Sequence, residues 1–436
     1  AVRMNPRREE EARLQPLGDG ALEGGFYAES FRRLDDRSVV WADARYVRGN
    51  RRNVRWNSTA DYLLLYPYVV ADSVGGDLTT EEYAFGGGYA RRIGRFDIAL
   101  RGDYRAAQEY RQVDPRPHNV VSDFTFRLGA GMELGRSVLI LDLRGRLYKQ
   151  NSRISFFNET NTVRELFMAG LGSILQRYSG KSGSTLTAYT GRGYAVAAQL
   201  MPHRPEGWYA RAEYSRFTTD RNYRPNNSIP VSTLRTQRGE AHVAYRAGRW
   251  SLGAYAARSQ RLGIEMVADR TGQGTPVDRQ AMYENRIWQA GAEATVEWRR
   301  GNRRYALRPG VEWQQSAAEY LWPSREMTLS RLGGSLRGHA EWLFARWRFK
   351  ASLGIGCYGA PSGTLSLPGL ADYLAEYLTG TAERLNSRTL APEAGFRAER
   401  RLRGRTACFA EAGWSPRLYE GGLAEHNLTA ACGFLF

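Results

Sequence analysis

Apolar and polar residues alternate along much of the chain with a period of two. Between residues 304 and 314, Tyr305, Leu307, Val311 and Trp313 hold odd positions, while charged and polar side chains hold most even positions. The same alternation recurs at residues 123–134, 288–298 and 347–357. It is typical of a β-strand with one apolar and one polar face, so the chain is predicted to be all-β. A soluble β-sandwich would show this pattern too, with its apolar face as core.

The connections between the strands separate the two architectures, because short and long connections alternate along the chain. Outer-membrane barrels sort their connections in this way, with short periplasmic turns and long extracellular loops. The pattern therefore predicts a transmembrane antiparallel up-and-down β-barrel of about sixteen strands, within a range of about 14–18. The short turns are predicted at Arg91–Arg95, Gly135–Arg136, Ala247–Gly248, Arg299–Asn302, Ala345–Arg346 and Leu402–Gly404, and the long connections near residues 109–119, 151–182, 220–230, 262–278 and 359–384.

Residues 423–436 are predicted to be the closing strand, since the even positions from Leu428 to Phe436 form an apolar face. A terminal strand that ends in phenylalanine resembles the C-terminal insertion signal of outer-membrane β-barrel proteins. The resemblance implies recognition by the barrel-assembly machinery. A barrel of this kind would contact outer-membrane lipids and lipopolysaccharide.

The first residues of the chain do not alternate. Asn5 and Pro6 favour the start of a short helix, and the glycines between Gly18 and Gly25 interrupt it. Residues 1–36 are therefore predicted to be a plug or tail, and residues 37–436 the barrel. The connection from Asp61 to Asp77 is too apolar for a solvated loop and is predicted to fold inward.

Composition narrows the alternatives further. The chain has 436 residues, of which 42% are hydrophobic, and a formal net charge of +17; its mean hydropathy is -0.53. No run of about eighteen apolar residues occurs, which disfavours a helical membrane protein. Arginine supplies nearly all the positive charge and is interleaved with acidic residues along the chain, which argues against a nucleic-acid interface. The cysteines Cys357, Cys408 and Cys432 lack metal-ligand spacing.

The polar faces of the predicted strands carry many charges, which would line the lumen. A structural lining of ion pairs and water is the first interpretation, and a ring of charges that selects ions is the second. The candidate lumen charges are Asp97, Arg101, Asp103, Arg105, Asp142, Arg144, Arg146, Arg211, Glu213, Glu293, Glu297, Arg308, Glu312, Arg337 and Glu341.

A further candidate is the connection that contains Asp114, Pro115, Arg116 and Pro117. Each proline fixes φ and lacks a backbone donor, so this stretch is predicted to be a rigid, ordered loop. Such a loop would either pin the barrel mouth or take part in binding.

No catalytic, cofactor or metal site is predicted. His242 and His339 are expected to face the lumen beside Glu240 and Glu341, where ordinary polar lining is favoured over a metal or haem contact. The sequence places no serine beside His426 for hydrolysis. An enzyme is therefore not expected.

Two stretches resemble a family of uncharacterised outer-membrane barrels of Bacteroidota. The first contains Trp56, Tyr66-Pro67-Tyr68 and Ala71–Asp77, with Tyr83 beyond, and the second runs from Asp114 to Asn119, before Ser122-Asp123-Phe124. Members of that family look to be encoded beside TonB-dependent transporters and surface lipoproteins. The resemblance implies an outer-membrane protein of a Gram-negative bacterium with a part in nutrient or iron acquisition.

These observations favour a transport or transport-accessory component that acts with a surface lipoprotein or a TonB-dependent partner. A structural or secretion-apparatus barrel, which binds partner proteins and conducts no solute, is the alternative. An outer-membrane enzyme with its site at the barrel rim is the third interpretation. Nucleic acid is not an expected partner.

The last two strands also predict a cysteine pair. If their hairpin is centred near Glu420, Cys408 and Cys432 lie directly opposite each other on the lipid-facing side. Proximity is expected, whereas a disulfide would require the closer, non-hydrogen-bonded type of pair.

Overall fold

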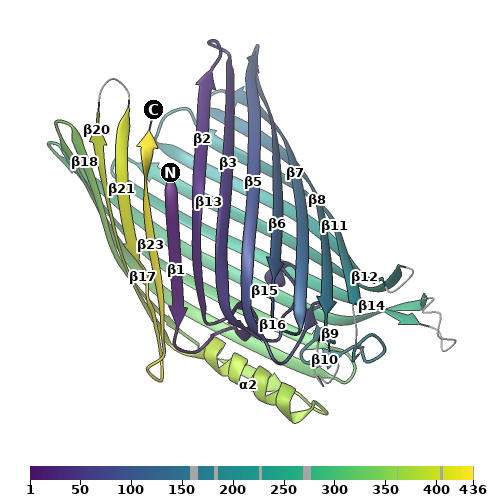
Figure 1. Ribbon diagram of the computed structural model, residues 1–436. Helices are drawn as coiled ribbons and strands as arrows, with labels where there is room; N and C mark the ends of the chain where they lie inside the picture. Colours follow the sequence, from purple (N-terminus) through teal and green to yellow (C-terminus); the bar gives the residue numbers. More distant parts are fainter. Residues whose placement is uncertain are drawn as a thin grey trace.

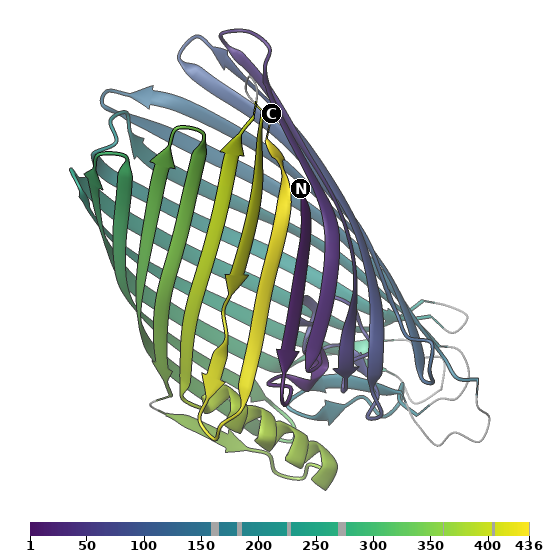
Figure 2. The ribbon, with the colours of Figure 1, turned by 60° about the vertical axis from the view of Figure 1, so that its left-hand side comes forward.

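A closed antiparallel barrel of 18 strands dominates the computed structural model, which describes residues 1–157, 165–180, 185–224, 228–268, 276–360, 362–402 and 406–435 (Figures 1 and 2). This confirms the all-β barrel, with a strand number at the upper limit of the predicted range. The wall strands are β1 (Val2–Glu9), β2 (Gly20–Arg33), β3 (Ser38–Val54), β5 (Gly76–Ile93), β6 (Phe96–Tyr110), β7 (Arg116–Leu134), β8 (Ser137–Ser155), β11 (Thr185–Pro202), β12 (Gly207–Tyr223), β13 (Ile229–Ala247), β14 (Trp250–Ala268), β15 (Pro276–Arg300), β16 (Arg303–Tyr320), β17 (Arg325–Phe344), β18 (Trp347–Gly359), β20 (Thr389–Arg401), β21 (Ala407–Trp414) and β23 (Ala424–Leu435).

Each wall strand pairs with the next wall strand along the chain, and β1 pairs with β23 to close the barrel, as Figure 2 shows at the seam. Two short strands extend the wall: β19 (Gly363–Ser366) pairs with β17, and β22 (Arg417–Tyr419) pairs with β20 and β23. The elements outside the wall are the 3-10 helix η1 (Gln15–Leu17), α1 (Tyr62–Leu65), β4 (Val70–Ala71), β9 (Leu166–Gly170), β10 (Ser173–Ile174) and α2 (Asp372–Asn386). Neither α-helix among the described residues is long and apolar enough to span a membrane.

The prediction that residues 1–36 form a plug or tail is wrong, because β1 and β2 are wall strands. β1 pairs with β23 and β2, and β2 pairs with β3. The glycines that suggested a break allow close strand contact instead: a Cβ on Gly25 would lie 2.4 Å from the backbone oxygen of Tyr46. The barrel therefore begins at Val2 rather than near residue 37.

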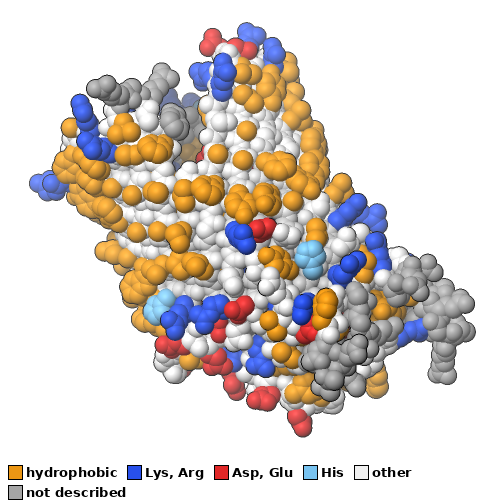
Figure 3. All heavy atoms as spheres, viewed as in Figure 1, with side chains coloured by type: hydrophobic (Ala, Val, Ile, Leu, Met, Phe, Trp, Pro, Cys, Tyr) orange, Lys and Arg blue, Asp and Glu red, His pale blue; other side chains and the backbone are white. Residues whose placement is uncertain are grey.

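The apolar faces of the strands point away from the lumen. Leu353 is 68% exposed and Val311 61% exposed, although both lie in mid-strand. Figure 3 shows hydrophobic side chains spread over the outside of the wall, with charged side chains more frequent toward its ends. A soluble sandwich would bury these residues, so the outward apolar face indicates contact with lipid and an outer-membrane location.

The connections are sorted between the two ends of the barrel as predicted. The short turns gather at one end, uppermost in Figure 1, and the long connections with α2 gather at the other. By the rule for bacterial barrels, the short-turn end is periplasmic. Phe436, the residue that carried the resemblance to an insertion signal, lies outside the described residues, as do parts of the long connections.

The predicted register of the last hairpin is wrong by one position at its centre. Cys408 lies opposite Phe434, and Ala410 lies opposite Cys432. The two cysteines are therefore diagonal neighbours on the same outward face, and both are free thiols.

Candidate functional site: a charged lumen closed at one mouth

The lumen is closed at the long-connection end by two segments of the chain. Residues 55–75 lead from β3 to β5 and contain α1 and β4, and residues 165–180 contain β9 and β10. Val70 of β4 pairs with Phe167 of β9, so the segments share a small three-stranded sheet. We call these two segments the inner plug. The prediction that Asp61–Asp77 folds inward agrees with this arrangement, because Leu65, Val69 and Ala71 are almost fully buried.

The inner plug packs against the wall on several sides of the barrel. One apolar cluster joins Leu65 and Val69 to Val121 of β7 and Tyr148 of β8. A second cluster joins Tyr68, Ala169 and Leu171 to wall residues that include Leu234 of β13, Tyr283 of β15 and Ala318 of β16. Contacts with strands this far apart in the wall mean that the plug spans the mouth.

Helix α2 covers the inner plug at this end. The Trp56 ring stacks on Tyr377 with ring centroids 5.1 Å apart, and on Tyr373 at 5.9 Å. Leu374 and Leu378 of the helix are buried. Trp56, the first residue of the stretch that carried the family resemblance, is thus one of the contacts between the plug and its cover.

Arginines of the wall hold the backbone of the inner plug. Arg221 of β12 is buried and donates to the carbonyl oxygens of Met168 at 3.0 Å and Val69 at 3.3 Å. Arg261 of β14 donates to the carbonyl oxygens of Leu63 and Leu64 at 2.9 and 2.7 Å. A guanidinium has five donors in a planar fork, so it satisfies carbonyl groups that an irregular buried segment would otherwise leave unpaired.

A third wall arginine ties the plug to the segment that leads into α2. Arg325, the first residue of β17, donates to the carbonyl oxygen of Leu171 and to Ser173 Oγ, both at 3.1 Å. It also donates to the carbonyl oxygen of Pro368 at 3.2 Å and to that of Gly369 at 3.3 Å. The closed mouth therefore depends on directional polar contacts as well as on apolar packing.

The stretch 114–117 is ordered and lies next to the plug, but only Asp114 and Pro115 belong to a loop, because Arg116 and Pro117 are the first residues of strand β7 and pair with β8. Asp114 accepts a hydrogen bond from the backbone N–H of Phe157 at 2.7 Å and pairs with Arg116 at 2.7 Å. Arg111 donates to the carbonyl oxygen of Pro115 at 2.7 Å, and its backbone N–H donates to that of Pro117. Among the open interpretations of this loop, these contacts favour pinning of the mouth.

Ion pairs join the lumen wall to the plug. Arg105 contacts Asp61 of the plug, Glu82 at 3.3 Å and Asp123 at 3.6 Å. Arg146 contacts the same Asp123 at 2.7 Å. Because Asp61 belongs to the plug, the Arg105 network is a charge contact between the inner plug and the wall.

The other predicted lumen charges all lie on the inward face, in smaller groups. Arg308 donates to Thr295 Oγ1 at 3.2 Å. Asp142, Glu293 and Glu312 have no basic partner at ion-pair distance among the described residues. The remaining pairs are Arg92–Asp97 at 2.9 Å, Arg101–Asp43 at 2.6 Å, Arg101–Asp103 at 2.5 Å, Arg144–Glu213 at 3.3 Å, Arg211–Glu213 at 2.5 Å, Arg246–Glu297 at 3.0 Å, Arg337–Glu393 at 2.9 Å and Arg348–Glu341.

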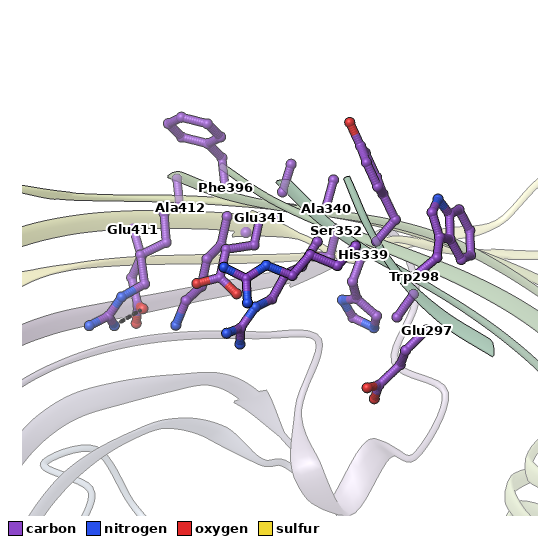
Figure 4. A pocket seen from close by; sticks show the side chains of 18 of the residues that line it. Glu297, Trp298, His339, Ala340, Glu341, Ser352, Phe396, Glu411 and Ala412 are labelled. Atoms are coloured by element: carbon purple, nitrogen blue, oxygen red, sulfur yellow. Dashed lines mark hydrogen bonds and ion pairs between the residues drawn. The ribbon is translucent and has the colours of Figure 1, made fainter. Parts of the chain in front are cut away.

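Two cavities lie along the inner wall, away from the plug. The larger, of about 850 Å³, is near the short-turn end, where Glu297, His339 and Glu411 point to one side of the wall while Phe396 and Trp298 point to the other (Figure 4). The smaller, of about 380 Å³, brings together predicted charges from β12, β15, β16 and β17. These charges are Arg211, Glu293, Glu312 and Arg337. The charges of β6 and β8 line neither cavity.

Burial raises the pKa of Glu165, in the plug, to about 7. Its carboxylate accepts a hydrogen bond from Thr185, and Arg221 lies close enough to lower the pKa in opposition to burial. The plug therefore contains one carboxyl group that titrates near neutral pH. Within the described residues, no three His, Cys, Asp or Glu side chains form a group that could hold a metal ion.

Sequence reasoning missed the residues that hold the plug, namely Arg111, Arg221, Arg261 and Arg325. Arg221 and Arg261 follow the same alternation as the lumen charges, so the pattern does not distinguish a plug anchor from an ordinary lining residue. For Arg111 the sequence did hold a signal. Arg111 lies just before Asp114-Pro115, and its partner Asp72 lies in the first family-like stretch.

Among solved structures, similar chains include the ferric preacinetobactin receptor BauA from Acinetobacter baumannii, at 9% identity and a TM-score of 0.46 over 100% of this chain and 75% of that one. The alcaligin outer membrane receptor FauA from Bordetella pertussis has 10% identity and a TM-score of 0.43, over 98% and 75%. A bacterial polysaccharide outer membrane secretin has 10% identity and a TM-score of 0.41, over 81% and 90%.

These identities and TM-scores carry no inference about activity. None of the curated proteins matches the chain. One family model matches residues 5–436, nearly the full length and including both family-like stretches. The chain therefore belongs to the family described as a family of unknown function (DUF6850).

Proposed function

We propose that this outer-membrane barrel is a transport or transport-accessory component, closed at rest, in which movement of the inner plug opens the lumen. The observation that carries the proposal is the way the plug is held. Arg221, Arg261 and Arg325 bind its backbone through individual hydrogen bonds, which can be exchanged for water one at a time.

The lumen beyond the plug supports the same proposal. It has cavities of about 850 and 380 Å³, and three of its acidic side chains have no basic partner within the part of the chain that the structure describes, so the inner wall is polar rather than packed shut. An inner wall of this kind suits passage of a hydrated solute better than a purely structural core would.

The proposed partners are a TonB-dependent transporter and a surface lipoprotein, in nutrient or iron acquisition by a member of the Bacteroidota. These follow from the family resemblance of the two stretches around Trp56 and Asp114. A pull-down from native outer membrane, analysed by mass spectrometry, tests them directly. Recovery of the barrel with neither class of partner contradicts this part of the proposal.

The test of the transport proposal is conductance in a planar bilayer. The parent protein is expected to be closed most of the time. The double variant Arg221→Gln/Arg261→Gln is expected to conduct, because it removes the four hydrogen bonds that these two arginines donate to the backbone of the plug. Arg238→Gln is the matched control, since Arg238 is a lumen arginine that pairs with Glu240 and has no contact with the plug in the described residues.

The alternative is a structural or secretion-apparatus barrel that binds partner proteins and conducts no solute. The extensive apolar contacts of the plug with two separate groups of wall strands favour it. Protease sensitivity of residues 55–75 reports whether the plug has left its place in the double variant. A released plug without conductance supports the alternative and contradicts transport.

A further inference from the structure

Arginines gather at the short-turn end of the barrel, although they are spread along the sequence. They lie in the turns or within two residues of them, because every second connection returns the chain to this end. The acidic residues in the same positions are Asp35, Asp36, Asp97, Glu133 and Glu206. The arginines are Arg32, Arg33, Arg37, Arg92, Arg95, Arg136, Arg204, Arg246, Arg249, Arg299, Arg300, Arg303, Arg304, Arg346, Arg348, Arg400 and Arg401.

The hairpin between β15 and β16 concentrates this charge most strongly. Arg300 lies directly opposite Arg303, and Arg299 lies directly opposite Arg304. Like charges in directly opposed positions of a β-ladder are destabilising. No carboxylate of the described residues lies within ion-pair distance of Arg300 or Arg303, and both are exposed. The arrangement is therefore one that an external anion would stabilise.

Arg300 and Arg303 lie on the outward face of this hairpin, next to aromatic residues. Trp298 and Tyr305, two positions further from the turn on the same face, stack with ring centroids 5.7 Å apart. Trp342 lies opposite Arg303 on the neighbouring strand. Aromatic girdles of barrels sit at the membrane–water interface. The two guanidinium groups, just beyond the girdle, are thus at the depth of the lipid head groups.

The same combination occurs on two nearby strands. Arg400 of β20 lies opposite Trp347 of β18, and its guanidinium carbon is 5.4 Å from the centroid of the tryptophan ring. Arginine is well suited to a phosphodiester group, because its planar fork donates two parallel hydrogen bonds.

We propose that the outward face of the β15–β16 hairpin is a binding site for an anionic phospholipid of the leaflet at the short-turn end. Arg300 and Arg303 bind the head-group phosphate between them, and Trp298 and Trp342 contact the adjoining glycerol and acyl region. The site is independent of the plug and of any transported solute. The ligand is a membrane lipid rather than free phosphate, since the acyl chains account for the flanking aromatic residues.

The test is native mass spectrometry of the purified full chain with phosphatidylglycerol, phosphatidylethanolamine or inorganic phosphate at equal concentrations. Phosphatidylglycerol is expected to remain bound to the parent protein. Each basic side chain near an anionic lipid surface raises the binding affinity about fivefold. Arg300→Gln/Arg303→Gln is therefore expected to weaken the retention of phosphatidylglycerol roughly thirtyfold. The conservative variant Arg300→Lys/Arg303→Lys is expected to retain part of the binding.

The matched control is Arg192→Gln/Arg216→Gln, which removes two outward arginines far from the short turns. Heat-modifiability on gels establishes that every variant is folded. Equal retention of the two phospholipids, unchanged retention in Arg300→Gln/Arg303→Gln, or equal loss in the control overturns the proposal. Displacement of phosphatidylglycerol by inorganic phosphate at the same concentration overturns the assignment to a membrane lipid.

Discussion

Arg111 Nη2 lies 2.8 Å from Asp72 Oδ2, and both side chains are only 2% exposed. Asp72 also accepts hydrogen bonds from Ser58 Oγ at 2.7 Å and from the backbone N–H of Gly75 at 2.6 Å. Arg111 is held in turn by the carbonyl oxygen of Pro115. This buried pair therefore joins the two family-like stretches, one in the plug and the other in the loop after β6.

Replacement of one partner of this pair is expected to loosen the plug. Asp72→Asn leaves Arg111 charged and buried without a counter-charge, which costs about 3–5 kcal/mol in comparable buried pairs. Hydrogen exchange of the amides in residues 55–75 measures the opening free energy of the plug. The double variant Asp72→Asn/Arg111→Met leaves no isolated charge. Its loss of opening free energy is therefore expected to be smaller than the sum of the losses in the two single variants.

The matched control for this pair is Arg116→Gln. Arg116 also pairs with an aspartate, Asp114, at 2.7 Å, but its side chain is 41% exposed. Exposed pairs contribute less than ~1 kcal/mol, so the control should leave exchange in the plug nearly unchanged. A similar effect of Asp72→Asn and Arg116→Gln would contradict the anchoring role of the buried pair.

The barrel could be predicted from the sequence because its signal is local. Each strand repeats the alternation of lipid-facing and lumen-facing residues, and the faces of Arg105, Glu213 and Glu341 follow from it directly. The first two strands escaped prediction because Pro6 and the glycines near Gly25 resemble breakers when read alone. Their role becomes visible only when the neighbouring strands are in place.

The partners of the lumen charges could not be predicted, since they depend on distant parts of the chain. Arg105 contacts Asp61, which lies in a connection between strands. The alternation of apolar and polar residues does not predict the path of such a connection. The same limit applies to Arg221, which binds carbonyl groups of two separate segments. An inward connection has no periodic pattern, so only its apolar composition revealed that it is buried.

A charged residue on the lipid-facing side of the wall should destabilise the barrel. Leu353→Arg is expected to cost ~2–4 kcal/mol near the bilayer midplane, whereas Ser352→Arg should cost much less. Ser352 lines the larger cavity on the inner wall, which has room for the longer side chain. Urea unfolding of refolded protein in lipid vesicles measures both variants. Equal costs would contradict the assignment of the two faces.

The orientation of the barrel can be tested with inserted epitopes. A tag after Ser324, in the connection between β16 and β17, is expected to be labelled on intact cells, because this connection belongs to the long-connection end. A tag after Asn302, in the turn between β15 and β16, is expected to be labelled only after permeabilisation. The reverse result would mean that the short turns face outward.

The stability of the plug should fall as pH rises from about 5 to about 8. Burial raises the pKa of Glu165 to about 7, above its ordinary value of 4.5, so the folded plug holds a proton that the open plug releases. The stabilisation of the plug by protonated Glu165 is complete below the ordinary pKa of a glutamate and is lost as pH rises through 7. Glu165→Gln is expected to reduce this dependence and to raise exchange protection of β9 at pH 8; the buried carboxyl group of Glu265, which accepts a hydrogen bond from Tyr68 of the plug, remains in the variant. Unchanged dependence in the variant would show that another group titrates.

The register of the last hairpin can be tested through its cysteines. Ala410 lies directly opposite Cys432, whereas Cys408 is diagonal to it. Directly opposed residues have Cβ atoms ~4.5–5.5 Å apart and diagonal neighbours ~7–8 Å, so a short bis-thiol reagent should distinguish the two arrangements. In a Cys357→Ser background, the variant Cys408→Ser/Ala410→Cys is expected to crosslink to Cys432 faster than the native Cys408 does, as read by mass spectrometry. Faster crosslinking of the native pair would instead centre the hairpin at Glu420, which would move every residue of β23 by two positions relative to β21 without changing the face that each one occupies.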